Sequence, residues 1–169
     1  MVDKLLITAH PDDEIIFAGH ALLKERGWKV ICVTNKYNKV RAEEFKKAMK
    51  RAKVYEYEIW DFQDCWKGDF DRRKLKERLK KVIEKQHFKV VLSHNLKGEY
   101  GHSQHSALSQ VVREIVTENL YEFSFGKKLS LYSRLRKWII LMIYKSERKV
   151  VLSKEVRQYV LRESMRKVK

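Results

Sequence analysis

The residues of this sequence that could do chemistry gather first at Ala9-His10-Pro11-Asp12-Asp13-Glu14. The apolar run Leu5 to Ile7 precedes this stretch, and the strongly apolar segment Ile15 to Leu23 follows it. The pattern predicts a buried strand that ends here and a helix that begins here. A histidine and carboxylates at such a junction can hold a metal ion or move protons. A structural interpretation stays open as well, in which Asp12 or Asp13 only caps the helix and Pro11 stiffens its first turn.

A second polar stretch, His94 to His105, follows another apolar run, Phe88 to Ser93. Because ligands bind at the carboxyl ends of the strands of a parallel sheet, we expect the two stretches to converge on one site. His102 and His105 are three residues apart, so they share a helix face or a tight turn. His10, one carboxylate of the Asp pair and one histidine of the second stretch would supply the three protein ligands of a catalytic zinc site.

The two consecutive carboxylates, Asp12 and Asp13, can divide two tasks. One can bind the metal while the other faces the metal-bound water, whose pKa zinc lowers to about 7. That second carboxylate can then accept the proton of the water. The residues alone leave open which of the two does which.

The elements that must position these stretches alternate between strand and helix. We predict strands at residues 4–8, 28–33, 55–60 and 88–93, and helices at residues 13–26, 40–52, 71–86 and 104–120. This alternation predicts an α/β fold, a Rossmann-like three-layer α/β/α sandwich with a mostly parallel sheet. No glycine-rich dinucleotide fingerprint follows the first strand, so the fold does not imply a nicotinamide cofactor.

The length of 169 residues predicts a single domain over residues 1–169, whose short C-terminal part, residues 121–169, packs on the sandwich or extends it. We predict helices at residues 129–144 and 153–168 in this part. The first contains the apolar run Trp138 to Tyr144 between basic residues. One interpretation is a core helix that closes the sandwich, and the sharper one is a helix that lies on an anionic membrane surface.

The formal net charge of +16 favours polyanionic partners, although a merely solvated basic surface would give the same value. No zinc finger, RRM, KH or helix-turn-helix motif accompanies the charge, so nucleic acid is not the favoured partner. Cys32 and Cys65 make neither a disulfide framework nor a zinc ribbon. Without a signal-peptide pattern or an apolar run of ~20 residues, we expect a cytoplasmic protein, with peripheral contact to the inner face of the membrane through the basic tail. The sequence leaves a homo-oligomer open.

Three motifs in this order resemble the PIG-L/LmbE-like N-acetylglucosaminyl deacetylases. They are His10-Pro-Asp-Asp-Glu14, Arg41-x-x-Glu44 and Glu99-Tyr-Gly-His-x-x-His105, within about Leu5 to Ile115. The resemblance implies a hydrolase that binds Zn²⁺ and removes the acetyl group from an N-acetylglucosamine-type conjugate, lipid- or polymer-linked ones included, with release of acetate. It implies the metal ligands His10, Asp13 and His105. Such a ligand set also accepts Fe²⁺, Co²⁺ or Mn²⁺.

The same resemblance implies roles for the residues around the metal. Asp12 would be the general base and later the acid, and Tyr100 and a protonated His102 would assist at the oxyanion or at the leaving amine. Arg41 would bind the substrate, and Asp64 would contact sugar hydroxyls. Asn95 and His94, at the tip of the strand 88–93, either line the pocket or have a structural role.

Ser103-Gln104 replaces the Pro-Asp pair of the family's second motif, which removes a carboxylate but no ligand. Two alternatives remain from the sequence. One is a deacetylase of another small N-acyl substrate. The other is a basic protein that binds a polyanion or nucleic acid and keeps only a structural metal site.

Overall fold

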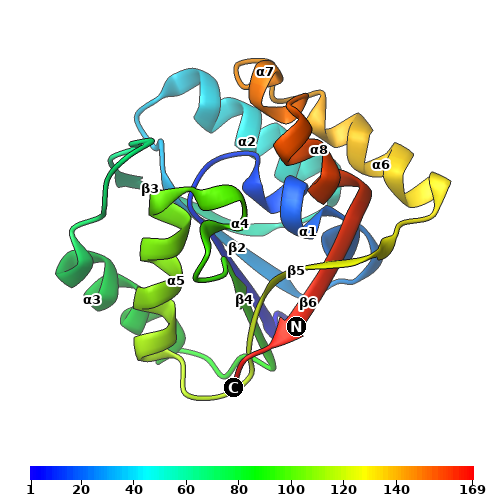
Figure 1. Cartoon of the computed structure of the whole chain (residues 1–169). Coiled ribbons are helices and arrows are strands. Elements are labelled where there is room, and N and C mark those ends of the chain that lie inside the picture. The colour runs from blue at the N-terminus through cyan, green and yellow to red at the C-terminus, as the bar shows by residue number, and fades with distance from the viewer.

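Six strands form one sheet in the computed structural model, which describes residues 1–169 (Figure 1). The strands are β1 Lys4–Thr8, β2 Trp28–Thr34, β3 Glu56–Phe62, β4 Val90–Ser93, β5 Leu120–Lys128 and β6 Arg162–Lys167. Their order in the sheet is β3-β2-β1-β4-β5-β6; β1 to β5 run parallel, and β6 is antiparallel to β5. The predicted α/β class with a mostly parallel sheet is thereby confirmed.

Helices cover both faces of the sheet. They are α1 Asp13–Lys24, α2 Lys39–Ala52, α3 Arg72–Ile83, α4 Gly98–Gly101, α5 Ser103–Ile115, α6 Leu131–Leu141, α7 Arg148–Val151 and α8 Lys154–Leu161. The apolar sides of α1, α2, α6 and α8 pack in one core with Leu6, and those of α3 and α5 pack in a second core with Leu5 and Ile7. Because side chains alternate between the faces of a strand, an unbroken apolar run such as β1 supplies both cores.

Side-chain caps set the start of most long helices. The side chains of Asn38, Asp71, Ser130 and Ser153 each accept a backbone N–H from the first turn of the helix that follows. Helix α1 is an exception, because its N-cap residue Asp12 makes no such hydrogen bond through its side chain. The carboxyl group of Asp12 is therefore not used for capping.

Two predictions for the C-terminal part were wrong. The helix predicted to reach Leu120 ends at Ile115, and the strand β5 follows it. The alternation of Tyr121, Phe123 and Phe125 with other residues is the period expected of a strand. The helix predicted over 153–168 ends at Leu161, and the remaining residues form β6.

The reason for the second error lies in the pairing of β6 with β5. Met165 continues the helical spacing of α8, yet it lies opposite Phe123 in the sheet. The charged sequence of β6 has little strand preference of its own, so tertiary pairing overrides it. The other predicted elements differ from the observed bounds by no more than three residues, and α4 and α7 are additional short helices.

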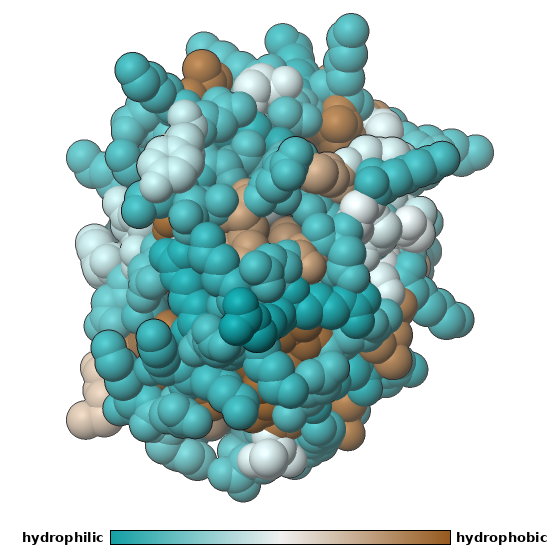
Figure 2. Space-filling view, turned by 90° about the vertical axis from the view of Figure 1, so that its left-hand side faces the viewer, coloured by the Kyte–Doolittle hydropathy of each residue, from teal (hydrophilic) through white to brown (hydrophobic).

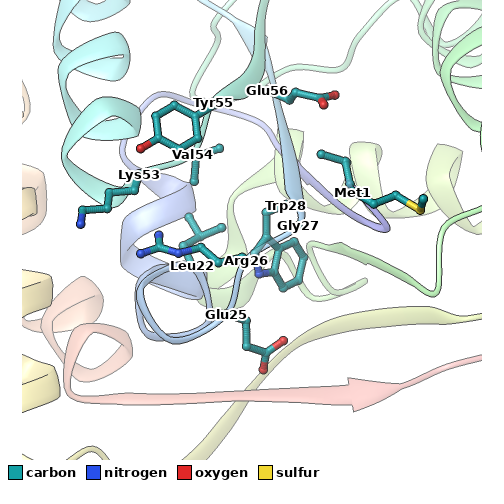
Figure 3. Close-up of a pocket in the computed structure, with 11 residues that line it drawn as sticks. Met1, Leu22, Glu25, Arg26, Gly27, Trp28, Lys53, Val54, Tyr55 and Glu56 are labelled. Carbon is teal, nitrogen blue, oxygen red and sulfur yellow. The ribbon is translucent and has the colours of Figure 1, made fainter.

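A hollow of about 300 Å³ lies at the amino ends of the strands, next to Met1 and Trp28 (Figure 3). Its lining contains Glu25 and Glu56 but no histidine, and it holds no cluster of three metal-ligating groups. Ligands of parallel sheets bind at the opposite, carboxyl ends of the strands. The polar cluster at that end is therefore the site to consider. The helices of the structure are all too short or too polar to cross a bilayer.

Candidate active site

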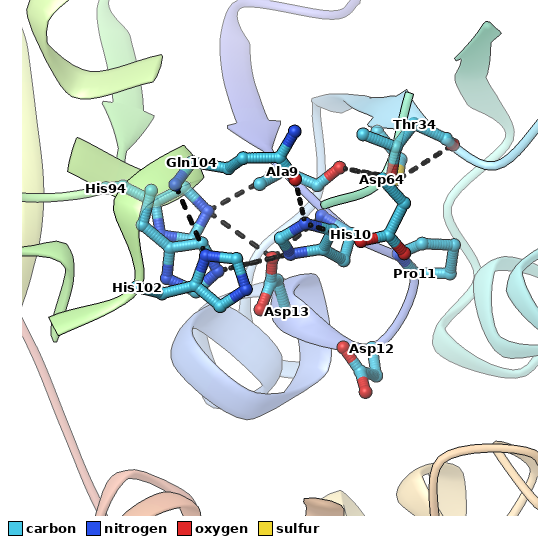
Figure 4. A network of polar contacts seen from close by, with 12 residues as sticks. Ala9, His10, Pro11, Asp12, Asp13, Thr34, Asp64, His94, His102 and Gln104 are labelled. Atoms are coloured by element: carbon cyan, nitrogen blue, oxygen red, sulfur yellow. Dashed lines mark hydrogen bonds and ion pairs between the residues drawn. The ribbon is translucent and has the colours of Figure 1, made fainter. Parts of the chain in front are cut away.

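Two segments far apart in the chain meet at the carboxyl ends of β1 and β4, which are neighbours in the sheet. The turn between β1 and α1 carries His10 and Asp13. The loop after β4 passes through α4 into α5, where His102 is the N-cap residue and His105 lies in the first turn. Figure 4 shows His10, Asp13 and His102 turned toward one another. All four side chains are buried, so the cluster lies beneath the surface of the rim.

Three atoms of this cluster form a nearly equilateral triangle. His10 Nδ1 lies 3.2 Å from His105 Nε2, and Asp13 Oδ2 lies 3.3 Å from each of these nitrogens. A tetrahedral zinc site with metal–ligand distances of about 2.0–2.1 Å has edges of ~3.3–3.4 Å between its ligand atoms. The triangle therefore has the dimensions of three ligands in such a site.

Hydrogen bonds fix which nitrogen of each of these two rings carries the proton. His105 Nδ1 lies 2.8 Å from Glu99 Oε2, which accepts, so the lone pair of His105 is on Nε2. His10 Nε2 lies 2.9 Å from Gln104 Oε1, so the lone pair of His10 is on Nδ1. Burial opposes ionisation of Asp13, but the neighbouring His105 and His10 hold its pKa well below the usual range. Two lone pairs and a carboxylate oxygen thus converge, an arrangement that fits a cation such as Zn²⁺.

Two other sets of three residues also have ligand atoms within 4.8 Å of one another, and each set contains a further histidine. In the set with Asp13 and His105, that residue is His94. Its Nε2 accepts the backbone N–H of Ala9 at 3.1 Å, and its Nδ1 donates to Glu99 at 2.8 Å. Both nitrogens are already used, so of the two roles considered for His94 the geometry favours the structural one.

The second of these sets contains His102, whose Nδ1 accepts the backbone N–H of Gln104 at 3.3 Å. Its proton is therefore on Nε2, which makes it a donor and not a ligand. Burial, followed by the nearby rings of His105 and His10, lowers the pKa of His102 to about 3. Among the groups of the protein alone, these surroundings favour the neutral ring over the protonated one that was expected. The neutral ring still donates through Nε2–H.

Glu99 orients the two histidines of the second segment that face it. Its Oε2 accepts Nδ1–H from both His94 and His105 at 2.8 Å, and its Oε1 accepts the backbone N–H of Asn95. Burial alone would raise the pKa of Glu99, but the two imidazoles lower it to about 2. The sequence analysis gave Glu99 no role of its own. The available signal was a single acidic residue between two histidines of one loop.

The turn that carries Asp12 has an uncommon backbone conformation. Asp12 has φ 111° and ψ −33°, a region that residues other than glycine seldom adopt. Three contacts hold the turn: the N–H of Asp12 donates to Glu14 Oε2, the N–H of His10 donates to Asp13 Oδ2, and Arg41 donates to the carbonyl of Pro11. Strained residues that are fixed by their surroundings concentrate at functional sites.

The Asp12 side chain is buried and makes no hydrogen bond within the protein. In Figure 4 it lies apart from the network and carries no dashed line. Burial, followed by the neighbouring charge of Asp13, raises the pKa of Asp12 well above its usual range. A bound cation would act in the opposite direction. Asp12 is thus a carboxyl group with free lone pairs, which is what a proton acceptor requires.

Comparison with known proteins decides the family. The family model described as PIG-L, GlcNAc-PI de-N-acetylase, matches residues 5–116, about two thirds of the chain. The chain belongs to the PIG-L family. A protein of Acanthamoeba polyphaga mimivirus is 34% identical over 171 residues, which cover 88% of this chain and 73% of that protein.

Solved structures share the PIG-L fold at low identity. N,N'-diacetylchitobiose deacetylase from Pyrococcus horikoshii superposes with a TM-score of 0.66 at 13% identity, over 91% of this chain and 72% of that one. A deacetylase of teicoplanin biosynthesis superposes with a TM-score of 0.65 at 12% identity, over 92% of this chain and 89% of that one. GalB, the 4-carboxy-2-hydroxymuconate hydratase from Pseudomonas putida, superposes with a TM-score of 0.68 at 20% identity, over 94% of this chain and 83% of that one. At these identities the likeness shows the fold alone, so the reaction has to be argued from the site.

The Ser103-Gln104 pair, which departs from the PIG-L motif, tethers the loop between β3 and α3. Ser103 Oγ donates to the carbonyl of Trp66 and accepts the N–H of Gly68, each at 3.0 Å. The Gln104 amide accepts the N–H of Cys65 at 3.0 Å and donates to the carbonyl of Gln63 at 2.8 Å. The pair therefore holds this loop against the first turn of α5, at the edge of the site.

The tethered loop presents Trp66 beside the site. Its ring is 63% exposed, lies 4.7 Å from the His102 ring and stacks on Tyr100 at 6.3 Å between centroids. Burial, followed by the charges of Asp13 and Asp12, raises the pKa of Tyr100, so its hydroxyl keeps its proton. That hydroxyl makes no hydrogen bond within the protein and can donate to a bound molecule. The sequence analysis missed Trp66, because its loop had no periodic pattern.

Arg41 joins three parts of the rim. Besides Pro11, its guanidinium contacts Asp64 at 2.8 Å and lies 3.5 Å from Glu147. Asp64 also lies 3.3 Å from His10 Nε2, so two of the three residues predicted to bind substrate, Arg41 and Asp64, border the cluster. Glu147, from the segment after α6, was not predicted.

Asn95, the third residue predicted to bind substrate, is committed to its own loop. Its Oδ1 accepts the N–H groups of Lys97 and Glu99, and its Nδ2 donates to the carbonyl of Phe123 at 3.3 Å. No free donor or acceptor is directed to the cluster. Of the two roles considered for Asn95, the geometry favours the structural one.

Glu99→Gln should weaken zinc binding about 10–100-fold, the usual effect of losing a carboxylate that orients a histidine ligand. The glutamine amide lacks the negative charge that raises the basicity of His105. Both carboxylate oxygens of Glu99 accept N–H groups, so the NH2 group of the glutamine would face an N–H that it cannot accept. The dissociation constant is measured by competition with a chromogenic chelator. Glu118→Gln, an exposed carboxylate elsewhere, is the control. Equal affinities of the wild type and Glu99→Gln would refute this role.

Proposed function

We propose that the chain is a metal-dependent amide hydrolase that removes the acetyl group from an N-acetylated amino sugar. The observation that carries the proposal is the triangle of His10 Nδ1, His105 Nε2 and Asp13 Oδ2, with the unbonded carboxyl group of Asp12 next to it. Membership of the PIG-L family and the deacetylases among proteins of this fold support it. A structural metal site alone would have no use for a buried, strained carboxylate beside it.

The metal would be held by His10, Asp13 and His105, and when bound it supplies a Lewis acid and a water of lowered pKa. Asp12 would accept a proton from the attacking water as the water oxygen adds to the acetamide carbonyl carbon. The C–N bond then breaks, and Asp12 returns the proton to the departing nitrogen. Acetate and the protonated amine are the products, because both protons of the water end on the departing nitrogen, so atoms and charge balance without another reactant.

Two further groups beside the cluster, His102 and Tyr100, could stabilise the negative charge that forms on the carbonyl oxygen. The neutral His102 ring offers Nε2–H, and Tyr100 offers its free hydroxyl. Donors that are fixed before the reaction stabilise a developing oxyanion at little cost in reorganisation. We propose these two groups as that pair of donors.

The sugar ring is proposed to pack on Trp66, whose exposed face adjoins His102 and Tyr100. The C–H groups of a pyranose form an apolar face that suits an aromatic ring, and aromatic walls with a few polar groups are typical of small-molecule sites. Asp64 and Glu147, both next to Arg41, are the carboxylates available to sugar hydroxyls.

Trp66→Ala should raise KM about three- to tenfold with little change in kcat, since a ring contact of about 0.5–1.5 kcal/mol is lost before the chemical step. Steady-state kinetics on one N-acetylglucosamine conjugate separates the two constants. Trp66→Phe, which keeps an aromatic face, is the matched control and should stay close to wild type. A fall in kcat at unchanged KM would contradict a role in binding.

The proposed reaction is tested by acetate release. Purified protein loaded with zinc is incubated with N-acetylglucosamine conjugates and, in parallel, with other small N-acyl amides. Treatment with a chelator should abolish release, and added Zn²⁺ should restore it. Release from the other amides only would leave a hydrolase but remove the sugar, whereas a metal-loaded protein that releases no acetate from either set would overturn the proposal.

A further inference from the structure

Helix α6 turns an apolar stripe toward solvent. Leu131, Leu135, Ile139 and Met142 are 74%, 58%, 44% and 41% exposed. Their spacing of four, four and three residues places them on one side of the helix and of the residue that follows it. An exposed helix side normally carries charged residues, so this one is the reverse of the usual arrangement.

The charged side chains of α6 border the stripe or point inward. At about 100° per residue, Arg134 lies on one edge of the stripe and Arg136 on the other, and the helix contains no acidic residue. Lys137 is fully buried and pairs with Glu163 at 2.8 Å. The inward face thus holds Lys137 together with the core residues Ile140 and Leu141, and the apolar stripe is a second, outward-facing set of side chains.

A basic groove of about 200 Å³ adjoins the stripe at Ile139. Its lining contains four cationic residues, Arg26, Arg51, Lys53 and Arg136, and no acidic one. None of the four forms an ion pair within the protein. Four unpaired cations around one hollow suit an anionic phosphate group.

The segment that contains this helix carries a net positive charge. Residues 127–157 contain ten Lys and Arg against two Glu, in a chain whose net charge is +16. The molecular side on which α3 lies is different, because mainly hydrophilic residues cover it (Figure 2). The α6 region therefore combines exposed apolar side chains with flanking cations.

We propose that the α6 stripe and the adjoining basic groove form a docking surface for an anionic phospholipid bilayer. Leu131, Leu135, Ile139 and Met142 enter the boundary between headgroups and acyl chains, and the arginines on both edges contact lipid phosphates. This is the arrangement of interfacial helices, in which apolar burial and attraction to anionic lipid act together. The proposal is independent of the reaction proposed above.

The segment that follows α6 borders the candidate active site. The residues after α6 pack against the turn of His10 to Glu14: the Tyr144 hydroxyl donates to Glu14, and Ser146 donates to Glu44. Glu147 follows, near Arg41. A bilayer bound at α6 would therefore lie against the same segment that borders the catalytic rim.

Co-sedimentation with lipid vesicles tests the proposal. Vesicles of phosphatidylcholine with phosphatidylserine should bind the protein at low salt, and vesicles of phosphatidylcholine alone should bind it far less. The double variant Leu135→Gln/Ile139→Gln should lower the partition coefficient at least about tenfold, because two exposed apolar side chains no longer enter the bilayer. Arg134→Gln/Arg136→Gln should lower it by about tenfold or more and reduce its dependence on salt.

Matched variants elsewhere keep the test specific. Val40→Gln/Tyr55→Gln replaces two exposed apolar residues, and Lys80→Gln/Lys81→Gln removes two exposed charges on α3; both should bind like the wild type. Asp12→Asn should also bind normally, whatever its activity. Absence of binding at low salt, or equal binding of all variants, would overturn the proposal. So would sedimentation velocity showing that α6 is covered by a second copy, with self-association lost in Leu135→Gln/Ile139→Gln.

Discussion

Asp12→Asn should lower kcat for acetate release by about 10²- to 10⁴-fold, the range that a positioned general base contributes. Asparagine keeps the size of the side chain and tolerates positive φ, so the turn should retain its shape. It loses the basic lone pair that accepts the proton of the attacking water. Because Asp12 is not in the ligand triangle, zinc affinity should stay close to that of the wild type.

Parallel measurements of kcat and zinc affinity separate this role from that of a ligand. Asp71→Asn is the matched control, since Asp71 is exposed, caps α3 and can be replaced by another capping residue. A variant that retained wild-type kcat would remove Asp12 as the base. Loss of zinc together with activity would instead assign Asp12 to the metal.

The central sheet could be predicted from the sequence because its signals are local. The apolar runs of β1, β2 and β4 and the helical spacing between them are enough for a parallel sheet covered on both faces. The edge strand β6 could not be predicted in the same way. Its charged residues form a strand only because they pair with β5. The residues of β5 that they pair with lie more than thirty positions earlier in the chain.

The candidate site likewise has a part that could be predicted from the sequence and a part that could not. Topology alone brings His10, Asp13 and His105 together, because the strands β1 and β4 that precede them are adjacent and parallel. The roles of Glu99 and Trp66 depend on which atoms face them after folding. The spacing of residues does not indicate which nitrogen of each histidine carries the proton. It does not indicate either that Ser103 tethers a loop.

The buried polar atoms of the site also explain why its residues form one unit. Glu99 stays ionised only because His94 and His105 donate to it, and those donations fix the lone pair of His105 toward Asp13. Removing one of these groups would lower the stability of the fold, since a buried charge with a missing partner is strongly destabilising. Ligand, orienting group and turn therefore depend on one another.

His105→Ala should lose bound zinc and, with it, acetate release. Only His10 and Asp13 of the triangle would remain, and two protein ligands are fewer than catalytic zinc sites use. The variant should also be less stable than the wild type, because Glu99 is left buried with one imidazole partner. Metal analysis after dialysis and thermal unfolding followed by circular dichroism measure the two effects.

The double variant His105→Ala/Glu99→Gln separates the loss of metal from the loss of fold. Replacing the carboxylate removes the unpaired buried charge, so the unfolding temperature should recover relative to His105→Ala, while zinc should remain absent. If His105→Ala instead retained zinc at wild-type affinity, the ligand set would have to be drawn from the other histidines, and His102 would be the next residue to replace. Recovery of zinc binding in the double variant would equally remove His105 from the site, because neither substituted side chain can supply the missing lone pair of an imidazole.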